Sequence, residues 1–75
     1  MTLNAVRVIA SDPPMPAGTY TAASVAGHLT DGTYSWLDVP DGEDARELDG
    51  WLDVWRVEIR TERRDGVVRY FARGK

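Results

Sequence analysis

The hydrophobic period of the chain changes at residue 56. Over residues 42–55, apolar side chains recur at the i, i+3, i+4, i+7 spacing of one helical face: Ala45, Leu48, Trp51, Leu52 and Trp55. Over residues 56–61, apolar or β-branched residues alternate with charged ones, which is typical of a half-buried strand. Asp65-Gly66 is the preferred dipeptide of a two-residue type I′ turn. The sequence therefore predicts a helix that is followed at once by an antiparallel hairpin.

The turn also predicts the register of this hairpin. If Asp65 and Gly66 form the whole loop, Arg64 faces Val67, and the earlier pairs follow from it: Glu62–Arg69, Arg60–Phe71 and Glu58–Arg73. Two of these pairs join opposite charges, and the Arg–Phe pair is compatible with a cation–π contact. The other face is apolar: Val57, Ile59, Val68, Tyr70 and Ala72. We expect this apolar face to bury Trp51 and Trp55.

The N-terminal half contains a second predicted helix. Thr21 is a suitable N-cap, and Asp31-Gly32 would end the helix. Its apolar stripe consists of Ala22, Val25, Ala26 and Leu29. Residues 3–10 fit either a helix or a strand, and we favour a helix. The remaining segments are a proline-rich loop over residues 12–18, a possible short strand over 18–20, and an extended or irregular segment over 33–40.

Length and composition indicate one small domain over residues 1–75. The chain has no cysteine, which excludes disulfides and thiolate metal sites and fits a reducing cytoplasm. No apolar run approaches the roughly 20 residues that a membrane helix needs, and the N-terminus lacks a signal-peptide pattern. We therefore expect a cytoplasmic domain that makes no contact with a membrane.

The order of the predicted elements resembles the winged helix-turn-helix family. Residues 20–29 look like the second helix of that fold, residues 45–55 like the third, and residues 56–71 like the wing. The resemblance implies an α+β fold with three helices and a C-terminal β-hairpin wing, and a role in DNA binding and transcription regulation. The segment 30–42 departs from the family, which usually joins these two helices by a short turn. The third helix also departs from it, because it is acidic where DNA-reading members carry basic and amide side chains.

Basic residues concentrate at the C-terminal end of the chain. Residues 56–75 carry seven basic and three acidic residues, whereas residues 1–55 carry two basic and nine acidic ones. A positive segment can neutralise phosphates, so charge and resemblance together predict binding of double-stranded DNA through the hairpin. A homodimer would supply more phosphate contacts than one copy. The candidate DNA-binding residues are Arg46, Arg56, Arg63, Arg64 and Lys75.

An alternative function is protein association. The acidic helix over residues 42–55 would then face a basic partner, and an exposed Trp36 would anchor the contact, unless Trp36 belongs to the core. The candidate residues for this interaction are Trp36, Glu43, Glu47 and Asp53. The same acidic surface also permits an acidic viral-type inhibitor or DNA mimic.

The sequence carries no signature of catalysis or of a metal site. Its glycines form no phosphate-binding loop, and no Gly-x-Ser-x-Gly motif occurs. His28 is the only histidine, so no second histidine or cysteine can complete a transition-metal site or a nucleophile–base pair. The acidic group of Asp38, Asp41, Glu43 and Asp44 lacks the spacing of an EF-hand loop. We expect no catalytic residue, no metal and no cofactor.

Overall fold

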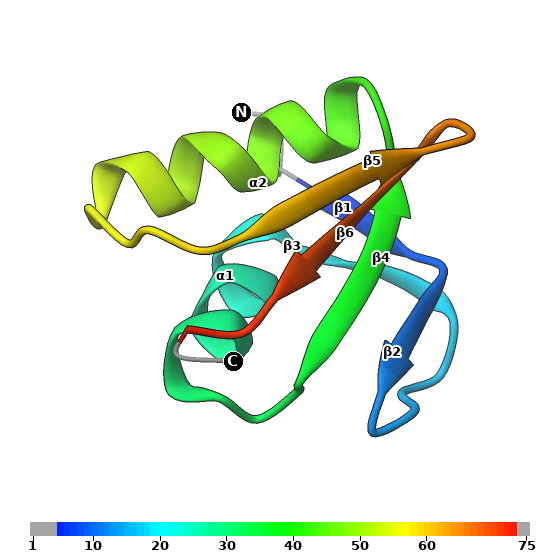
Figure 1. Ribbon diagram of the computed structural model, residues 1–75, viewed down its shortest axis with the longest axis horizontal. Helices are drawn as coiled ribbons and strands as arrows, with labels where there is room; N and C mark the ends of the chain where they lie inside the picture. The colour runs from blue at the N-terminus through cyan, green and yellow to red at the C-terminus, as the bar shows by residue number, and fades with distance from the viewer. Residues whose placement is uncertain (1–4, 74–75) are drawn as a thin grey trace.

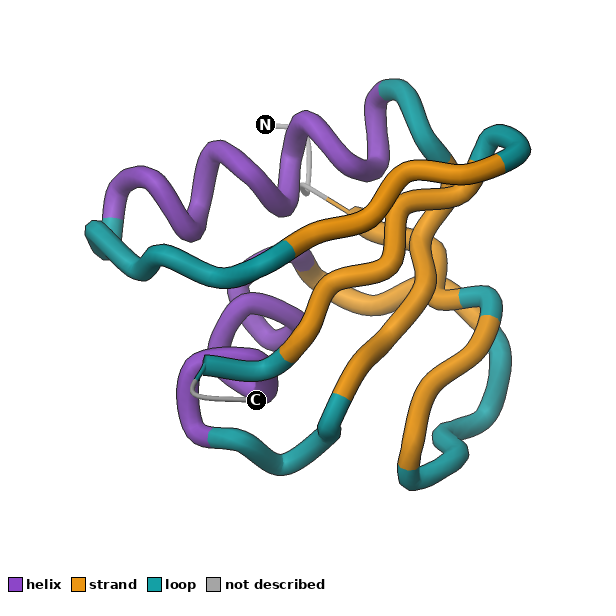
Figure 2. Tube along the Cα trace, viewed as in Figure 1, coloured by secondary structure: helices purple, strands orange, loops and turns teal. Residues whose placement is uncertain are grey.

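Two antiparallel sheets and two helices make up the chain over residues 5–73, which are the residues that the computed structural model describes (Figure 1). The elements, in order, are β1 (Ala5–Val8), β2 (Ala10–Asp12), β3 (Gly18–Thr21), α1 (Ala22–Asp31), β4 (Trp36–Pro40), α2 (Glu43–Val54), β5 (Thr61–Arg64) and β6 (Val67–Phe71). The smaller sheet pairs β1 with β3. The larger sheet has the strand order β2-β4-β6-β5, and its four strands run side by side in Figure 2.

The predicted winged helix-turn-helix fold is wrong. The structure has two helices in place of three, and β4 separates α1 from α2 in the chain. In the larger sheet β4 is a central strand between β2 and β6, so the segment 33–40, predicted to be extended or irregular, contributes a strand to the framework. The two helices are therefore not consecutive helices of a helix-turn-helix unit.

The N-terminal segment that we predicted to be helical forms β1 and β2. Val6 and Val8 are buried while Arg7 between them is exposed, which is the period of two that a strand requires. The segment passes from one sheet to the other at Ile9, whose backbone N–H donates to the carbonyl oxygen of Asp38 at 2.9 Å. Pairing on both sheets satisfies backbone groups that a short isolated helix would leave free. Residues 3 and 4 of the predicted helix lie outside the described residues.

Helix α1 confirms its sequence prediction. The Thr21 side chain accepts a hydrogen bond from the backbone N–H of Ser24 at 3.2 Å, as an N-cap does. Gly32 ends the helix in the left-handed conformation at φ 79°, and its N–H donates to the His28 carbonyl oxygen. The predicted stripe faces the core and is buried: Ala22, Val25, Ala26 and Leu29.

Helix α2 confirms its predicted span but only part of its predicted burial. Gly42 occupies the N-cap position without a side-chain hydrogen bond, so Asp41, which is a suitable N-cap residue, does not cap this helix. The buried residues are Ala45, Leu48 and Leu52. Trp51 is half-buried against the core, whereas Trp55 is 41% exposed. The helix ends at Val54 and the chain then turns at Arg56, with φ 58°, so Trp55 lies past the helical stripe and the prediction that it is buried is wrong.

The hairpin turns at Asp65-Gly66 as predicted. Both residues have positive φ, 52° and 76°, which a type I′ turn requires. Arg64 pairs with Val67 and Glu62 with Arg69, in the predicted register. The backbone N–H of Phe71 donates to the carbonyl oxygen of Arg60 at 3.0 Å, which extends the ladder by one pair.

The first strand of this hairpin is shorter than predicted. It begins at Thr61, because the residues before it carry the chain from the end of α2 to the sheet. The predicted pairing of Glu58 with Arg73 is wrong: the N–H of Arg73 donates instead to the carbonyl oxygen of Leu29, at 3.0 Å. The last described residues thus attach to α1 and not to the hairpin.

The core lies between the helices and one face of the larger sheet. It contains the inward-facing residues of β4 and β6, and its largest fully buried side chains include Leu29, Leu37, Leu48 and Tyr70. The predicted inner hairpin face is confirmed for Val68, Tyr70 and Ala72, while Val57 and Ile59 are half-buried against the core. Neither helix within residues 5–73 is long and apolar enough to cross a membrane.

Two glycines allow the turn and the helix to be tested with one substitution each. Gly66→Ala should lower the free energy of unfolding by about 1–2 kcal/mol, because a left-handed conformation strains any side chain. Gly50→Ala should raise it by about 0.5–1 kcal/mol, because Gly50 lies in α2 and an added Cβ would meet no atom within 4 Å. Urea denaturation of both variants measures the two effects. If both substitutions changed the free energy of unfolding in the same direction, either the turn or the helix would be contradicted.

Candidate functional site

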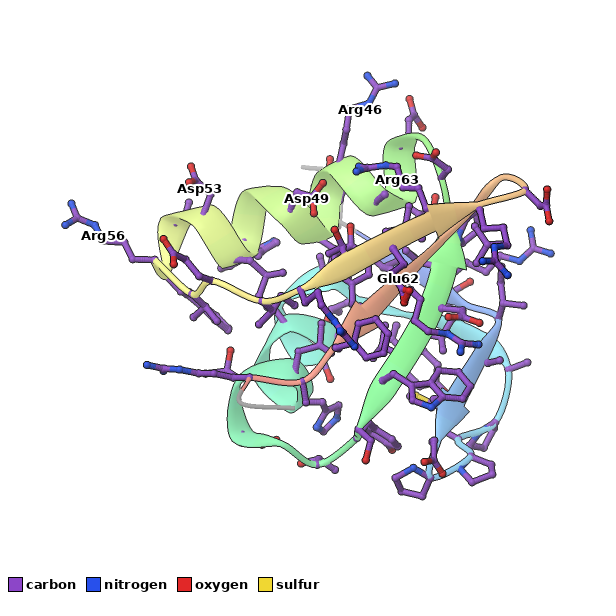
Figure 3. All side chains as sticks on the ribbon, viewed as in Figure 1. Arg46, Asp49, Asp53, Arg56, Glu62 and Arg63 are labelled. Carbon is purple, nitrogen blue, oxygen red and sulfur yellow. The ribbon has the colours of Figure 1, made fainter. Side chains whose placement is uncertain are left out.

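The four predicted DNA-binding residues that the structure describes do not form one surface. Arg46 and Arg56 project away from the body of the molecule at opposite ends of α2, while Arg63 extends from β5 toward α2 (Figure 3). Arg64 is exposed beside the hairpin turn. Lys75 lies outside the described residues. No single flat surface can therefore use Arg46, Arg56 and Arg64 together.

Arg63 takes part in a polar network between the hairpin and α2. Its guanidinium lies 3.6 Å from Asp41 and 3.7 Å from Asp49, so Arg63, which was predicted to bind DNA, already faces two carboxylates. The hydroxyl of buried Tyr70 donates to the Asp49 carboxylate at 2.7 Å and lies 3.1 Å from the carbonyl oxygen of Ala45. Burial of Tyr70 and its bond to Asp49 raise the pKa of this phenol far above its ordinary value. The network holds β6 against α2.

The face of the larger sheet that points away from the helices is open to solvent and carries two arginines, each stacked on an aromatic ring. Arg69 forms a two-pronged bond with Asp38, with N–O distances of 2.8 and 3.1 Å, and its guanidinium lies 3.8 Å from the ring centre of Trp36. Arg60 lies 4.1 Å from the ring centre of Phe71, which confirms the predicted cation–π contact. The Asp38 carboxylate raises the pKa of Arg69, so this arginine remains charged. Trp36 belongs to this face and not to the core.

The outer side of α2 near its C-terminal end carries the most exposed large apolar side chain within residues 5–73, Val54. Val54 is 73% exposed, and Trp55 packs edge-on against Trp51 with their ring centres 5.6 Å apart. A depression of about 490 Å³ lies beside them, lined by Arg46, Glu47, Gly50, Trp51 and Val54. We call Trp51, Val54 and Trp55 the tryptophan patch. Sequence analysis missed Val54, although an apolar residue outside the helical stripe is a signal that could have revealed it.

Acidic side chains lie along α2, and one of them, Glu47, lines the depression beside Trp51 and Val54. Glu43 and Asp53 are exposed and Glu47 is half-exposed. These are the three carboxylates that the protein-association hypothesis selected, and the structure places them on the same helix as the patch. Trp36, the fourth residue of that hypothesis, lies on the open sheet face instead.

The acidic residues of the segment 38–44 do not converge on a common point. Asp38 binds Arg69, Asp41 faces Arg63, and Asp44 accepts a hydrogen bond from the backbone N–H of Arg7 at 2.8 Å. His28 packs edge-on against Tyr34. Within residues 5–73, no three histidine, cysteine or carboxylate side chains are grouped so that they could hold a metal ion.

Comparisons of the chain with models of protein families, with curated proteins and with solved structures gave no match. The assignment of a function therefore depends on the surfaces described above.

The Tyr70 hydroxyl should make stability depend on alkaline pH. Because the folded state raises the pKa of Tyr70, this contribution is complete below the ordinary tyrosine pKa of about 10 and is lost as pH rises above it. Tyr70→Phe should lower the free energy of unfolding by about 1–2 kcal/mol at pH 7 and should flatten the decline above pH 10. Denaturation curves between pH 7 and 11 measure both effects.

Tyr34→Phe is the matched control for this experiment. The Tyr34 hydroxyl has no hydrogen-bond partner among residues 5–73, and the Tyr34 ring packs edge-on against His28, a contact that phenylalanine retains, so removal of the hydroxyl should leave the free energy of unfolding at pH 7 unchanged. If Tyr34→Phe and Tyr70→Phe behave alike, the hydroxyl of Tyr70 does not link the hairpin to α2.

Proposed function

We propose that the protein is a small protein-association module that docks a basic partner on α2. The observation that carries this proposal is the tryptophan patch, where two tryptophans and a valine of 73% exposure lie together. Scattered exposed apolar residues are normal in a folded protein, but a cluster of large ones marks interaction surfaces. Tryptophan is also enriched among the residues that contribute most to binding between proteins.

The charge on α2 defines the chemistry of the partner. Five acidic residues and one arginine lie within the helix, and Glu47 borders the depression beside Trp51. Carboxylates at the edge of an apolar contact favour partners with positive potential and speed the encounter with them. The best fit is a partner that presents apolar anchors surrounded by lysine or arginine. A DNA mimic would use the same carboxylates but would have no need of the tryptophans.

The same features make α2 a poor surface for DNA. Its carboxylates would repel phosphates, and Arg63, the nearest hairpin arginine, is already engaged by Asp41 and Asp49. Protein association therefore accounts for both the acidic charge and the exposed tryptophans of this helix.

Val54→Ser should remove most of the binding without affecting the fold. The probe is an amphipathic helical peptide of leucine and lysine, with a leucine–glutamate peptide of the same pattern for comparison, and calorimetric titration gives the affinity. We expect only the lysine peptide to bind. Val54→Ser should weaken its binding about tenfold, since each anchor residue contributes more than about 1 kcal/mol to the binding free energy. The paired charge reversals Glu47→Lys and Asp53→Lys should weaken it further.

Ile9→Ser is the matched control, because Ile9 is also an exposed apolar residue, at 45%, but lies between β1 and β2. The affinity of this variant for the lysine peptide should equal that of the unaltered protein. Equal binding of both peptides, or equal effects of Ile9→Ser and Val54→Ser, would refute docking at the patch. Sedimentation of the protein alone tests a second copy as occupant: a dimer that Val54→Ser dissociates would replace the basic partner in this proposal.

DNA binding through the hairpin is a second candidate function. The observation that favours it is Arg64, which is exposed beside the turn and has no acidic ion-pair partner among residues 5–73. A hairpin tip can reach the sugar-phosphate backbone without bringing α2 close to it.

The two hairpin arginines should differ in their effect on DNA. Arg64→Ala should weaken binding to random duplex DNA and lower the salt slope by about 0.9, the value for one lost phosphate contact. Arg63→Ala should change binding less, because its guanidinium already faces two carboxylates. Fluorescence anisotropy at several salt concentrations measures both slopes. Identical slopes for the two variants would contradict a contact by Arg64.

A further inference from the structure

The open face of the larger sheet presents its side chains in rows that cross the strands. One row contains Asp12 on β2, Trp36 on β4 and Phe71 on β6, and Arg60 continues it beyond Phe71. The next row contains Ala10, Asp38, Arg69 and Glu62. Trp36 and Phe71 are direct partners on the two central strands, so the two rings are neighbours on a surface that no helix covers.

Each ring has a guanidinium stacked against it. Arg69 lies over Trp36 at 3.8 Å and Arg60 over Phe71 at 4.1 Å. The side chain of Arg69 is 42% exposed and Arg60 is exposed, so both planar groups are accessible from solvent. The two-pronged bond from Asp38 fixes the plane of the Arg69 guanidinium. The face therefore offers two neighbouring flat π surfaces, one of them held in place in advance.

We propose that this face binds unpaired nucleobases, so that the polynucleotide it accepts is single-stranded. The proposal rests on the second candidate function, DNA binding through the hairpin, and specifies that the bound nucleic acid is single-stranded. Unpaired bases stack on aromatic rings and on arginine guanidinium planes. In a duplex these base faces are covered by neighbouring bases, and only the edges are offered in the grooves. A flat surface with stacked planes suits the first form of nucleic acid and not the second.

The charges of the face fit a contact in which stacking contributes more than phosphate neutralisation. Arg69 is balanced by Asp38 and by Glu62 opposite it. Arg60 and Arg64 remain for phosphates, and both point to this face from the same edge of the sheet. Two phosphate contacts predict a shallow salt slope of about 1.4 for a single strand. Single-stranded DNA and single-stranded RNA share this chemistry, so the proposal includes both as ligands.

A strand without bases tests the inference directly. The probes are a twelve-nucleotide mixed DNA strand, its RNA equivalent, the DNA duplex, and a strand of the same length with abasic sites at every position but the ends. We expect the DNA or RNA strand to bind about tenfold tighter than the abasic strand and the duplex. Whichever of these two single strands binds more tightly identifies the preferred ligand as DNA or RNA.

Arginine-to-lysine substitutions separate stacking from charge. Arg60→Lys keeps the positive charge but loses the plane, so it should weaken the normal strand several-fold and leave the abasic strand unchanged. Arg64→Lys is the matched comparison, because within residues 5–73 only Arg60 and Arg69 are stacked on a ring. This variant alters a phosphate contact and no stacking plane, so it should change the affinities for the normal and the abasic strand by the same factor. Neither exposed residue is expected to affect folding, which circular dichroism checks.

The outcomes distinguish this inference from the function on which it rests. Equal binding of normal and abasic strands, or equal effects of Arg60→Lys and Arg64→Lys, would overturn base stacking and leave phosphate binding by the hairpin intact. Tighter binding of the duplex would do the same. Failure of every polynucleotide to bind at low salt would overturn the inference together with the second candidate function.

Discussion

The antiparallel pairing of β4 with β6 is the interaction on which the rest of the structure depends. Five consecutive residue pairs join residues 36–40 to residues 67–71, two segments that lie about thirty positions apart in the sequence. The alternate residues of both strands point to the helices and are buried: Leu37, Val39, Val68 and Tyr70. Because these side chains form the floor of the core, α1 and α2 both need this pair of strands in order to bury their apolar stripes.

The same pairing creates the two surfaces to which we assign functions. On its inner side, Tyr70 reaches Asp49 and fixes the hairpin relative to α2, which leaves the outer side of that helix free to carry the tryptophan patch. On its outer side, the partners Trp36 and Phe71 lie next to each other under two arginines. A basic partner on α2 and a polynucleotide on the open face would thus occupy different sides of one small molecule.

Internal pairing explains why a charge count is a poor guide to the binding surface here. Residues 56–75 are strongly basic as a sequence, but Arg63 faces two carboxylates of the 41–49 segment and Arg69 is bound by Asp38. The acids that engage these two arginines come from the acidic part of the chain, so part of the basic charge is paired within the fold. Only arginines that point away from those acids remain for an external ligand, and their positions follow from the register and not from the composition.

The sequence by itself determined the local elements that depend on neighbouring residues. The cap at Thr21, the left-handed Gly32, the span of α2 and the Asp65-Gly66 turn with its register were all predicted, because each needs only a few adjacent side chains. Of the candidate sites, the acidic face of α2 and the Arg60–Phe71 contact were predicted for the same reason.

The tertiary structure alone decided which conformation residues 5–10 and 33–40 adopt. Short apolar runs fit a strand or a helix equally well until a partner strand is available. Here the partner of β4 is β6, which lies about thirty residues away in the sequence. It also decided that Trp55 is exposed, that Trp36 lies on the open face, and that Arg63 is engaged by acids. These outcomes depend on which distant segments come together. Strands that are hydrogen-bonded to each other can lie far apart in the sequence, so a local sequence pattern does not show which strands will pair.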